Sequence, residues 1–229
     1  MEILYEDNHI IVINKSVAEI VQVDKTKDKS IEELLKEYLK IKYNKPGDVF
    51  IGVVHRIDRP VSGVVLFART SKALTRLNEM FQDKSVEKIY WAIVKDKPAE
   101  PQGTLTHYVL RNTKTNKSYC YEKETPGSKI AVLSYRLVAS SDNFHMLEIN
   151  LETGRHHQIR CQLAAIGCPI RGDLKYGFPR SNPDAGISLH SRKISFMHPV
   201  REEKMVIVAP VPNNDKLWKF FEEAMVNDE

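Results

Sequence analysis

The amino-acid sequence predicts an α+β protein built on a mixed, largely antiparallel β-sheet with flanking helices. Two observations support this fold class. Strand-like runs and amphipathic helical segments are interspersed along the 229 residues. They do not alternate regularly as strand, helix and strand, which is the pattern of a parallel sheet. The length exceeds the common domain size but suits one sizeable core, so we expect residues 1–229 to form a single domain.

The first part of the chain predicts two strands, a helix and two further strands. Ile3 to Tyr5 and Ile10 to Ile13 are strand-like runs on either side of the turn signal Asp7-Asn8. Ser30-Ile31-Glu32-Glu33 has the form of a capping box, and the apolar residues after it follow helical spacing. Two more apolar runs predict strands: Val49 to Val54 and Val64 to Ala68.

The middle of the chain predicts a helix, a strand and a hairpin around a polar segment. Ser71 is expected to cap a helix, and Lys88 to Val94 alternates like a strand. Residues 95–129 are rich in Pro, Gly, Thr and Lys, which indicates a long excursion from the sheet. Ala131 to Ala139 and Phe144 to Leu151 follow as a paired hairpin.

The last part predicts two helices and one strand. Thr153 can cap a helix from Arg155 to Ile166, with Gly167 as its stop signal. Met205 to Val208 is a late strand. The final helix is amphipathic, and its expected core stripe consists of Leu217, Phe220, Phe221 and Met225.

The composition is that of an ordinary globular protein, with 42% hydrophobic and 28% charged residues. The start of the chain has no secretory signal pattern, and no apolar run is long enough to cross a bilayer. Cys120, Cys161 and Cys168 are odd in number and lack CxxC spacing, which favours a reduced cytoplasm over a disulfide framework. We interpret Cys161 and Cys168 as core-filling residues and expect a cytoplasmic protein.

Positive charge is concentrated in one stretch. Residues 155–193 contain seven Lys and Arg against two acids, so this stretch carries +5 while the whole chain carries +4. Such a concentration suits a phosphate-rich partner. A solvated basic surface is the alternative.

The most informative stretch is His55-Arg56-Ile57-Asp58-Arg59-Pro60-Val61-Ser62-Gly63. Pro60 cannot donate to a sheet ladder and Gly63 allows unusual backbone angles, so Asp58 is expected where a strand gives way to a loop. In an extended segment Arg56 and Asp58 project to the same face, and the guanidinium would keep the carboxylate ionised. This arrangement describes a nucleophile or general base. The alternative is an ordinary structural ion pair.

A second stretch, Leu151-Glu152-Thr153-Gly154-Arg155-His156-His157-Gln158-Ile159-Arg160, predicts an anion site. A helix that opens with Thr-Gly-Arg offers unpaired backbone N–H groups and a guanidinium to a phosphate. Cations at this end oppose the helix dipole, which is mild support for an anionic ligand. His157, Gln158 and Arg160 would supply further donors. The alternative is a surface helix with a positive first turn.

The histidines do not predict a metal site. His156, His157, His190 and His198 form no helix-spaced pair such as HExxH, and no carboxylate accompanies them at ligand spacing. The sequence also lacks a GxGxxG or P-loop fingerprint. We therefore expect neither a metal nor a cofactor.

Sixteen consecutive residues, His55 to Thr70, closely resemble the active-site motif of the RluA-type RNA pseudouridine synthases. The resemblance implies that Asp58 is the essential catalytic residue. Residues 88–94 resemble the family motif whose Tyr stacks on the target uracil, which nominates Tyr90. On residue chemistry alone, a Tyr on a half-buried strand is usually a packing residue.

Two further motifs extend the resemblance. The second stretch described above is similar to the family's third motif, in which the final Arg, here Arg160, pairs with the catalytic Asp. His156 departs from the family pattern, which usually has a small hydroxyl residue or Lys there. Leu189-His190-Ser191 resembles a closing strand motif and implies that His190 is structural or lies near RNA.

The resemblance runs from Ile3 to Pro212 and departs from the family at Ser16 to Ala18. Many relatives carry an N-terminal S4-type RNA-binding domain, whereas this chain starts on the catalytic fold, so we expect the core itself to choose the substrate. The resemblance implies a mixed sheet with an active-site cleft across its middle. It also implies an isomerase that converts specific uridines of ribosomal or transfer RNA to pseudouridine by flipping the base.

The expected partner is RNA, the expected oligomeric state is a monomer, and no membrane association is expected. Arg56 would fill the space that the flipped base vacates. Two alternatives remain: a glycosylase or nucleosidase that releases free base, and a catalytically silent RNA-binding module. The RNA-contacting residues that we expect are Arg56, Arg59, Arg155, His157, Gln158, Lys175 and His190.

Overall fold

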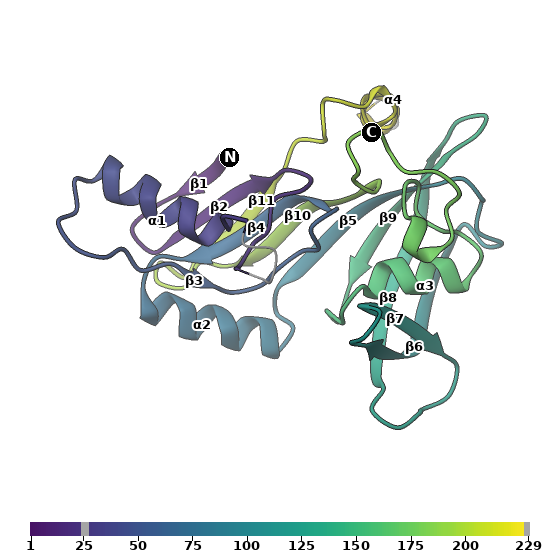
Figure 1. Ribbon diagram of the computed structural model, residues 1–229, viewed down its shortest axis with the longest axis horizontal. Helices are drawn as coiled ribbons and strands as arrows, with labels where there is room; N and C mark the ends of the chain where they lie inside the picture. The colour runs from purple at the N-terminus through teal and green to yellow at the C-terminus, as the bar shows by residue number, and fades with distance from the viewer. Residues whose placement is uncertain (24–27, 227–229) are drawn as a thin grey trace. The chain divides into compact units, whose positions relative to one another are not determined.

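The computed structural model describes residues 1–23 and 28–226 (Figure 1). They divide into two compact units. Unit 1 comprises Met1–Val86 and Lys193–Pro210, and unit 2 comprises Glu87–Arg192 and the chain from Val211 onward. Strand β10 (Leu189–Met197) runs from unit 2 into unit 1. The expectation of a single domain stays a prediction.

Unit 1 contains a sheet in the order β1-β2-β4-β10, with β3 on β4 and β11 on β10. The pairs β1–β2, β2–β4, β3–β4 and β10–β11 are antiparallel, as predicted for this sheet. The strand expected from Val49 to Val54 is shorter than predicted, because only Gly52 and Val53 pair with β4. The other strands lie close to their predicted positions: β1 (Glu2–Glu6), β2 (Ile10–Lys15), β4 (Ser62–Ala68) and β11 (Lys204–Val208).

Two helices belong to unit 1, α1 (Ile31–Lys42) and α2 (Ser71–Gln82). The predicted capping box opens α1, with Ser30 Oγ accepting from Glu33 N at 3.3 Å and Ser30 N donating to Glu33 Oε2 at 2.8 Å. The predicted cap of α2 is wrong by one residue, since Thr70 Oγ1 accepts from Ala73 N at 3.2 Å. The core of this unit joins one face of the sheet to α2 through Val64, Leu66, Ala73 and Leu77.

Unit 2 contains a sheet in the order β10-β5-β9-β8-β6-β7. Residues 95–129 are not the excursion from the sheet that their composition predicted, because they contain β6 (Gln102–Asn112) and β7 (Lys117–Tyr121), which pair within the sheet. Outward positions of this hairpin are exposed, which makes its composition resemble that of a loop. The remaining strands match their predictions: β5 (Glu87–Val94), β8 (Lys129–Ser140) and β9 (His145–Leu151).

The helices of unit 2 are α3 (Gln158–Ala165) and α4 (Lys216–Val226), with a 3-10 turn η1 at Leu174–Tyr176. The helix predicted from Arg155 to Ile166 begins three residues later than expected, while Gly167 ends it with a φ of 79° as predicted. The stripe of α4 is partly wrong, since Trp218 and Phe221 are buried and Phe220 is 47% exposed. Among the described residues no helix is long and apolar enough to cross a membrane.

Candidate active site

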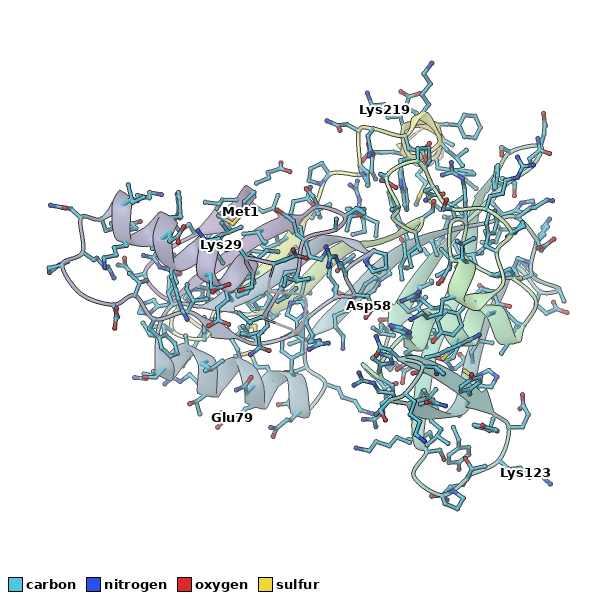
Figure 2. All side chains as sticks on the ribbon, in the orientation of Figure 1. Met1, Lys29, Asp58, Glu79, Lys123 and Lys219 are labelled. Carbon is cyan, nitrogen blue, oxygen red and sulfur yellow. The ribbon has the colours of Figure 1, made fainter. Side chains whose placement is uncertain are left out.

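Asp58 lies on the loop that connects β3 to β4 (Figure 2). Its carbonyl oxygen accepts from Val61 N at 3.0 Å, which closes a turn over Arg59 and Pro60. Gly63 then enters β4 with a φ of 113°, a conformation that side chains with a Cβ rarely adopt. Asp58 therefore lies on a loop, as predicted, but within it and not at the end of a strand, since β3 ends at Val53; its side chain is half-buried.

The imidazole of His55 ends the pairing between β3 and β4. Val53 is the last residue of β3 opposite β4, at Phe67, and the next N–H group along β4, that of Leu66, donates to His55 Nε2 at 3.0 Å. The ring also stacks on Phe81 with 5.0 Å between ring centroids. The side chain takes the place of a strand carbonyl, so the backbone after His55 can leave the sheet and carry Asp58.

Lys15, at the end of β2, anchors the Asp58 loop through hydrogen bonds to backbone carbonyl groups. It has no exposed surface, and its Nζ donates to Ser16 O at 2.8 Å and to Arg59 O at 3.1 Å. Arg59 O also accepts from Ala18 N at 3.1 Å. The Ser16–Ala18 segment, which departs from the family pattern, is thus tied to the carbonyl that follows Asp58. Ala18 has a φ of 71°, a strained conformation that these contacts maintain.

Burial changes the acidity of this lysine. Removal from water lowers the pKa of Lys15 to about 8, and the negative charges of Glu19 and Asp58 oppose that shift. Asp58 is therefore a nearby counter-charge of a buried ammonium group. The sequence reading missed Lys15, although a lysine that ends an otherwise apolar strand, after Ile10 to Ile13 and Asn14, was a signal for a buried cation.

The two arginines beside Asp58 are exposed. Arg59 Nη2 forms an ion pair with Asp28 Oδ2 at 2.8 Å, and the two side chains are 45% and 51% exposed. Arg56 also presents its side chain to solvent. Both residues are accessible to a polyanion, and their contact with RNA stays a prediction.

Tyr90 lies in the middle of β5, opposite Ile149 of β9. Its side chain is only 6% exposed. Side chains alternate along a strand, so the neighbouring Trp91 faces the other side of the sheet, where the guanidinium of Arg192 lies 4.3 Å from the indole centroid. Tyr90 therefore lies on the opposite face of β5 from Trp91.

Arg160 lies in the first turn of α3 and is 5% exposed. Its Nε donates to Asp173 Oδ2 at 2.7 Å and its Nη2 donates to Asp173 Oδ1 at 2.9 Å. This bidentate pair fixes the plane of the guanidinium, whose Cζ lies 5.1 Å from the ring centroid of Tyr176. Sequence reasoning missed Asp173 as a partner, although it ends the run Gly167–Asp173 that follows the predicted helix.

A hydrogen-bonded network surrounds the start of α3. Tyr176 OH accepts from Ser118 N at 2.8 Å and lies 2.9 Å from His157 Nδ1. His157 has a φ of 52°, and its ring stacks on His156 with 3.8 Å between centroids. Burial, followed by the charge of Arg160, lowers the pKa of His157 to about 2, so the ring is neutral and supplies no cation to a phosphate.

The predicted phosphate seat at this helix is not formed as expected. Thr153 does not cap α3, because its Oγ1 donates to Gln158 Oε1 at 2.8 Å and accepts from Val132 N at 2.8 Å. Gln158 Oε1 also accepts from Arg155 N at 2.9 Å, and its Nε2 donates to Val132 O at 3.1 Å. The Arg155 backbone N–H and the Gln158 amide, which the sequence assigned to an anion, are therefore used within the protein.

The remaining predicted RNA contacts differ in exposure. Lys175 is exposed and Arg155 is half-buried, with Arg155 Nε donating to Ile130 O at 3.0 Å. His190 has no exposed surface and lies 5.8 Å from the ring centroid of Trp218, which favours the structural role over the RNA contact. For His157, Gln158 and His190, burial argues against direct contact with RNA.

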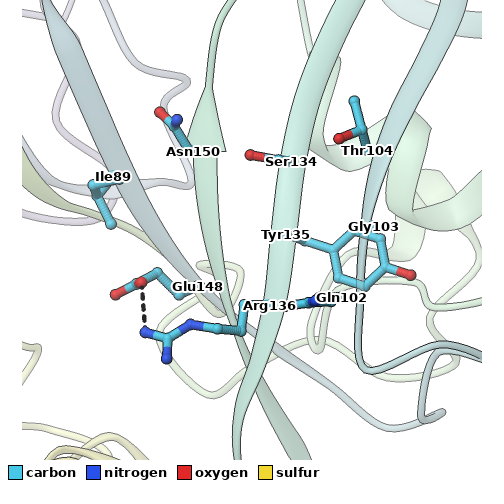
Figure 3. A pocket seen from close by; sticks show the side chains of 9 residues that line it. All are labelled: Ile89, Gln102, Gly103, Thr104, Ser134, Tyr135, Arg136, Glu148 and Asn150. Carbon is cyan, nitrogen blue, oxygen red and sulfur yellow. Dashed lines mark hydrogen bonds and ion pairs between the residues drawn. The ribbon is translucent and has the colours of Figure 1, made fainter.

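A cavity of about 440 Å³ lies on the unit 2 sheet (Figure 3). Ile89, Asn150, Ser134 and Thr104 line it as consecutive partners across four strands. Arg136 Nη2 and Glu148 Oε1 form an ion pair of 3.1 Å beside them. None of Asp58, Tyr90 and Arg160 lines it, and its one basic side chain is already paired, so this cavity is not the candidate active site.

The candidate catalytic residues come from both units. Asp58 belongs to unit 1, whereas Tyr90 and Arg160 belong to unit 2. Each of the three residues lies on an anchored element: a turned loop for Asp58, the middle of a strand for Tyr90 and the first turn of a helix for Arg160. The pairing of Arg160 with Asp58 stays a prediction, and the structure adds Asp173 as a partner of this arginine.

Comparisons with known proteins agree with the resemblance. The family model described as RNA pseudouridylate synthase matches residues 9–165. An uncharacterized RNA pseudouridine synthase of Synechocystis is 34% identical over 93% of this chain, which spans 66% of that relative. Ribosomal large subunit pseudouridine synthase D of Zymomonas mobilis is 30% identical over 95% of this chain, which spans 71% of that relative.

The fold also has a counterpart among solved structures. The human protein named RNA Pseudouridylate Synthase Domain Containing 4 superposes with a TM-score of 0.79. The two share 22% sequence identity, and the match covers 98% of this chain and 93% of that one. This comparison shows the fold alone, and it confirms the predicted mixed, largely antiparallel sheet with flanking helices.

Proposed function

This chain belongs to the RNA pseudouridylate synthase family, and we propose from that premise that it isomerises a specific uridine of ribosomal or transfer RNA through Asp58. Members of this family are isomerases that convert uridine to pseudouridine in RNA. The Zymomonas relative is named as a ribosomal large subunit pseudouridine synthase, which favours ribosomal RNA, with transfer RNA as the alternative.

The reaction breaks the glycosidic C–N bond, rotates the uracil and joins C5 of the base to C1′ of the ribose. A carboxylate can begin it, because uracil is a tolerable leaving group and no second carboxyl acid is required, unlike in an ordinary retaining glycosidase. Asp58 either attacks C1′ or removes a proton on the way to a glycal. Tyr90 stacks on the uracil and lies near the reacting base.

One observation carries this proposal: Asp58 sits on a turn whose backbone is held by a buried lysine. The hydrogen bonds from Lys15 Nζ and Ala18 N to Arg59 O fix the residue next to Asp58. A preorganised carboxylate reacts faster than a mobile one, since its entropy is lost before the substrate arrives. An ordinary surface ion pair needs no such support.

The proposed RNA contacts are the accessible basic residues: Arg56, Arg59, Arg155 and Lys175. Arg56 fills the space that the flipped base vacates, and the other three contact phosphates. Flipping costs roughly a few kcal/mol in structured RNA, which such contacts must offset. We also propose that the chain acts as a cytoplasmic monomer, and sedimentation of the purified chain, with and without RNA, tests the oligomeric state.

The decisive experiment is Asp58→Asn, assayed by tritium release from RNA labelled at C5 of uridine. The substitution keeps the shape and removes the reactive charge, so turnover should vanish while RNA affinity stays within a few fold, because affinity comes mainly from phosphate contacts. Asp142→Asn, on an exposed bend between β8 and β9, is the matched control and should retain full activity. Turnover by Asp58→Asn would refute the assignment.

The products distinguish the remaining alternatives. Release of free uracil by the wild type would identify a glycosylase or nucleosidase. Binding of RNA without tritium release from any cellular RNA would identify a silent binding module. Mapping pseudouridine across cellular RNA in a strain that lacks the gene identifies the substrate, because the modified position disappears from that map.

A further inference from the structure

Two thiols that lie far apart in the sequence meet inside unit 2. Cys120 Sγ and Cys161 Sγ are 3.0 Å apart, although 41 residues separate them along the chain. Cys120 belongs to β7 and is half-buried, whereas Cys161 belongs to α3 and is 4% exposed. The prediction of Cys161 as a simple core-filling residue did not anticipate this partner.

Strand register and helix packing bring the two thiols together. Cys120 pairs with Val109 of β6, so its side chain shares the inward face of β7 with Ser118, while Tyr119 and Tyr121 face outward. Cys161 lies on the buried side of α3, in a cluster with Val109, Ala131 and Tyr176. Regular elements hold both sulfurs, so their proximity does not depend on a loop.

We propose that Cys120 and Cys161 form a modification site: a reversible disulfide whose oxidant is a small-molecule disulfide such as glutathione disulfide. This proposal goes beyond the proposed function and does not depend on it. A disulfide has an S–S distance of about 2.0 Å, so the sulfurs need to approach by about 1 Å. Small shifts of two packed elements accomplish this.

The chemistry proceeds by two thiol–disulfide exchanges. Cys120, the more accessible thiol, attacks as the thiolate and forms a mixed disulfide, releasing one small thiol. Cys161 then attacks Cys120 Sγ as the thiolate and releases the second small thiol. Two protein thiols are oxidised, one small-molecule disulfide is reduced to two thiols, and the two protons end on the released thiols.

The resting state favours this order of events. The hydrogen bond between the two thiols, together with burial, raises the pKa of Cys161, so Cys161 is a poor first nucleophile. That hydrogen bond disappears once Cys120 carries the small thiol, which removes the largest cause of the shift. Cys161 is also adjacent to Arg160, so the bond would tie β7 to the first turn of α3.

The test uses the purified full chain, equilibrated in glutathione buffers of increasing oxidised fraction and trapped by alkylation. We expect the chain to lose two hydrogens, a peptide map to show Cys120 joined to Cys161, and Tm to rise because the cross-link restricts the unfolded chain. Addition of dithiothreitol should reverse all three changes. Full alkylation of all three cysteines, or glutathione attached to Cys120 with no link to Cys161, would overturn the proposal.

Matched variants identify the pair. Cys168 lies apart from the two thiols, with Sγ 3.7 Å from Ile166 O, so Cys168→Ala should keep the cross-link. Cys120→Ser and Cys161→Ser should each abolish it and the Tm rise. A cross-link that survives in Cys120→Ser, or that is lost in Cys168→Ala, would show that another pair of cysteines forms the bond and would contradict the proposal.

Discussion

The Asp58 loop and the first turn of α3 hold their key residues in different ways. The loop is anchored through its backbone, since Arg59 O receives hydrogen bonds from Lys15 Nζ and Ala18 N. Arg160 is anchored through its side chain, which forms a bidentate pair with Asp173. Backbone anchoring fixes where a side chain begins, whereas the bidentate pair fixes the direction in which the guanidinium points.

This difference predicts whether a substitution mainly lowers turnover or mainly lowers folding stability. Changes around Asp58 should lower turnover more than they change folding, because the anchoring contacts place a reactive group. Changes around Arg160 should lower folding stability first, since its partner Asp173 is 1% exposed. The variants described next test this distinction between catalytic and structural effects.

Arg160→Ala should have the largest effect. It leaves the buried carboxylate of Asp173 without its counter-charge, and breaking a buried pair in this way costs about 3–5 kcal/mol of unfolding free energy. Arg160→Lys should recover only part of this loss, because an ammonium group cannot form the bidentate pair. Urea unfolding at pH 7 measures both variants. A loss below about 1 kcal/mol would show that the pair is no stronger than an exposed one.

The same variants test the proposed pairing of Arg160 with Asp58. If it exists, Arg160→Ala moves the acidic limb of the pH–rate profile to higher pH, since the reactive form of Asp58 is ionised. Asp173→Asn keeps the guanidinium charge and should leave that limb in place. A purely phosphate-binding Arg160 instead gives weaker RNA affinity, a shallower salt slope and an unmoved limb.

Lys15→Met comes next, and its effect depends on pH. The pKa of Lys15 is about 8 in the folded chain, against an ordinary 10.5, so between these values the unfolded chain binds more protons than the folded one. Wild-type stability should therefore rise, relative to Lys15→Met, from about pH 8 to 10.5 by about 3 kcal/mol in total, and this gain is lost as pH falls through 8. Unfolding of both proteins at pH 7, 9 and 10 measures the difference. A constant difference would show that Lys15 does not titrate in this window.

Tyr90→Phe should have a smaller and purely catalytic effect. The ring still stacks on the uracil, but the hydroxyl is lost, so turnover should fall by about 100-fold if the phenol moves a proton. RNA affinity should change little. Single-turnover rates and filter binding on the same RNA separate the two effects. Unchanged turnover would show that Tyr90 contributes through stacking alone and that its hydroxyl moves no proton.

Arg59→Ala should have the smallest effect on folding. Its ion pair with Asp28 is exposed on both sides, so unfolding free energy should change by less than about 1 kcal/mol. RNA affinity should fall modestly, and the salt slope should become shallower if Arg59 contacts a phosphate. Asp28→Ala removes the same ion pair but keeps the cation, so it is the matched control. Equal losses of RNA affinity in both variants would contradict a phosphate contact.

The sequence predicted the elements whose signals are local. The capping box at Ser30 and the stop at Gly167 depend on neighbours along the chain, and both were confirmed. The start of α3 was wrong because Thr153 and Gln158 bond to Val132, a residue of another strand. Asp173 and Cys120 were missed for the same reason, since their partners are distant in sequence. Local patterns identify candidate residues, whereas their partners depend on tertiary packing.

The imidazole of His55 has a consequence for how this enzyme can diverge. Because Leu66 N–H is satisfied by the His55 side chain, this hydrogen bond of β4 does not depend on the backbone path from Arg56 to Asp58. Mutations that reshape this part of the loop can therefore accumulate with little loss of stability in β4. The segment before Asp58 can therefore vary while the carboxylate keeps its place, without rebuilding the scaffold.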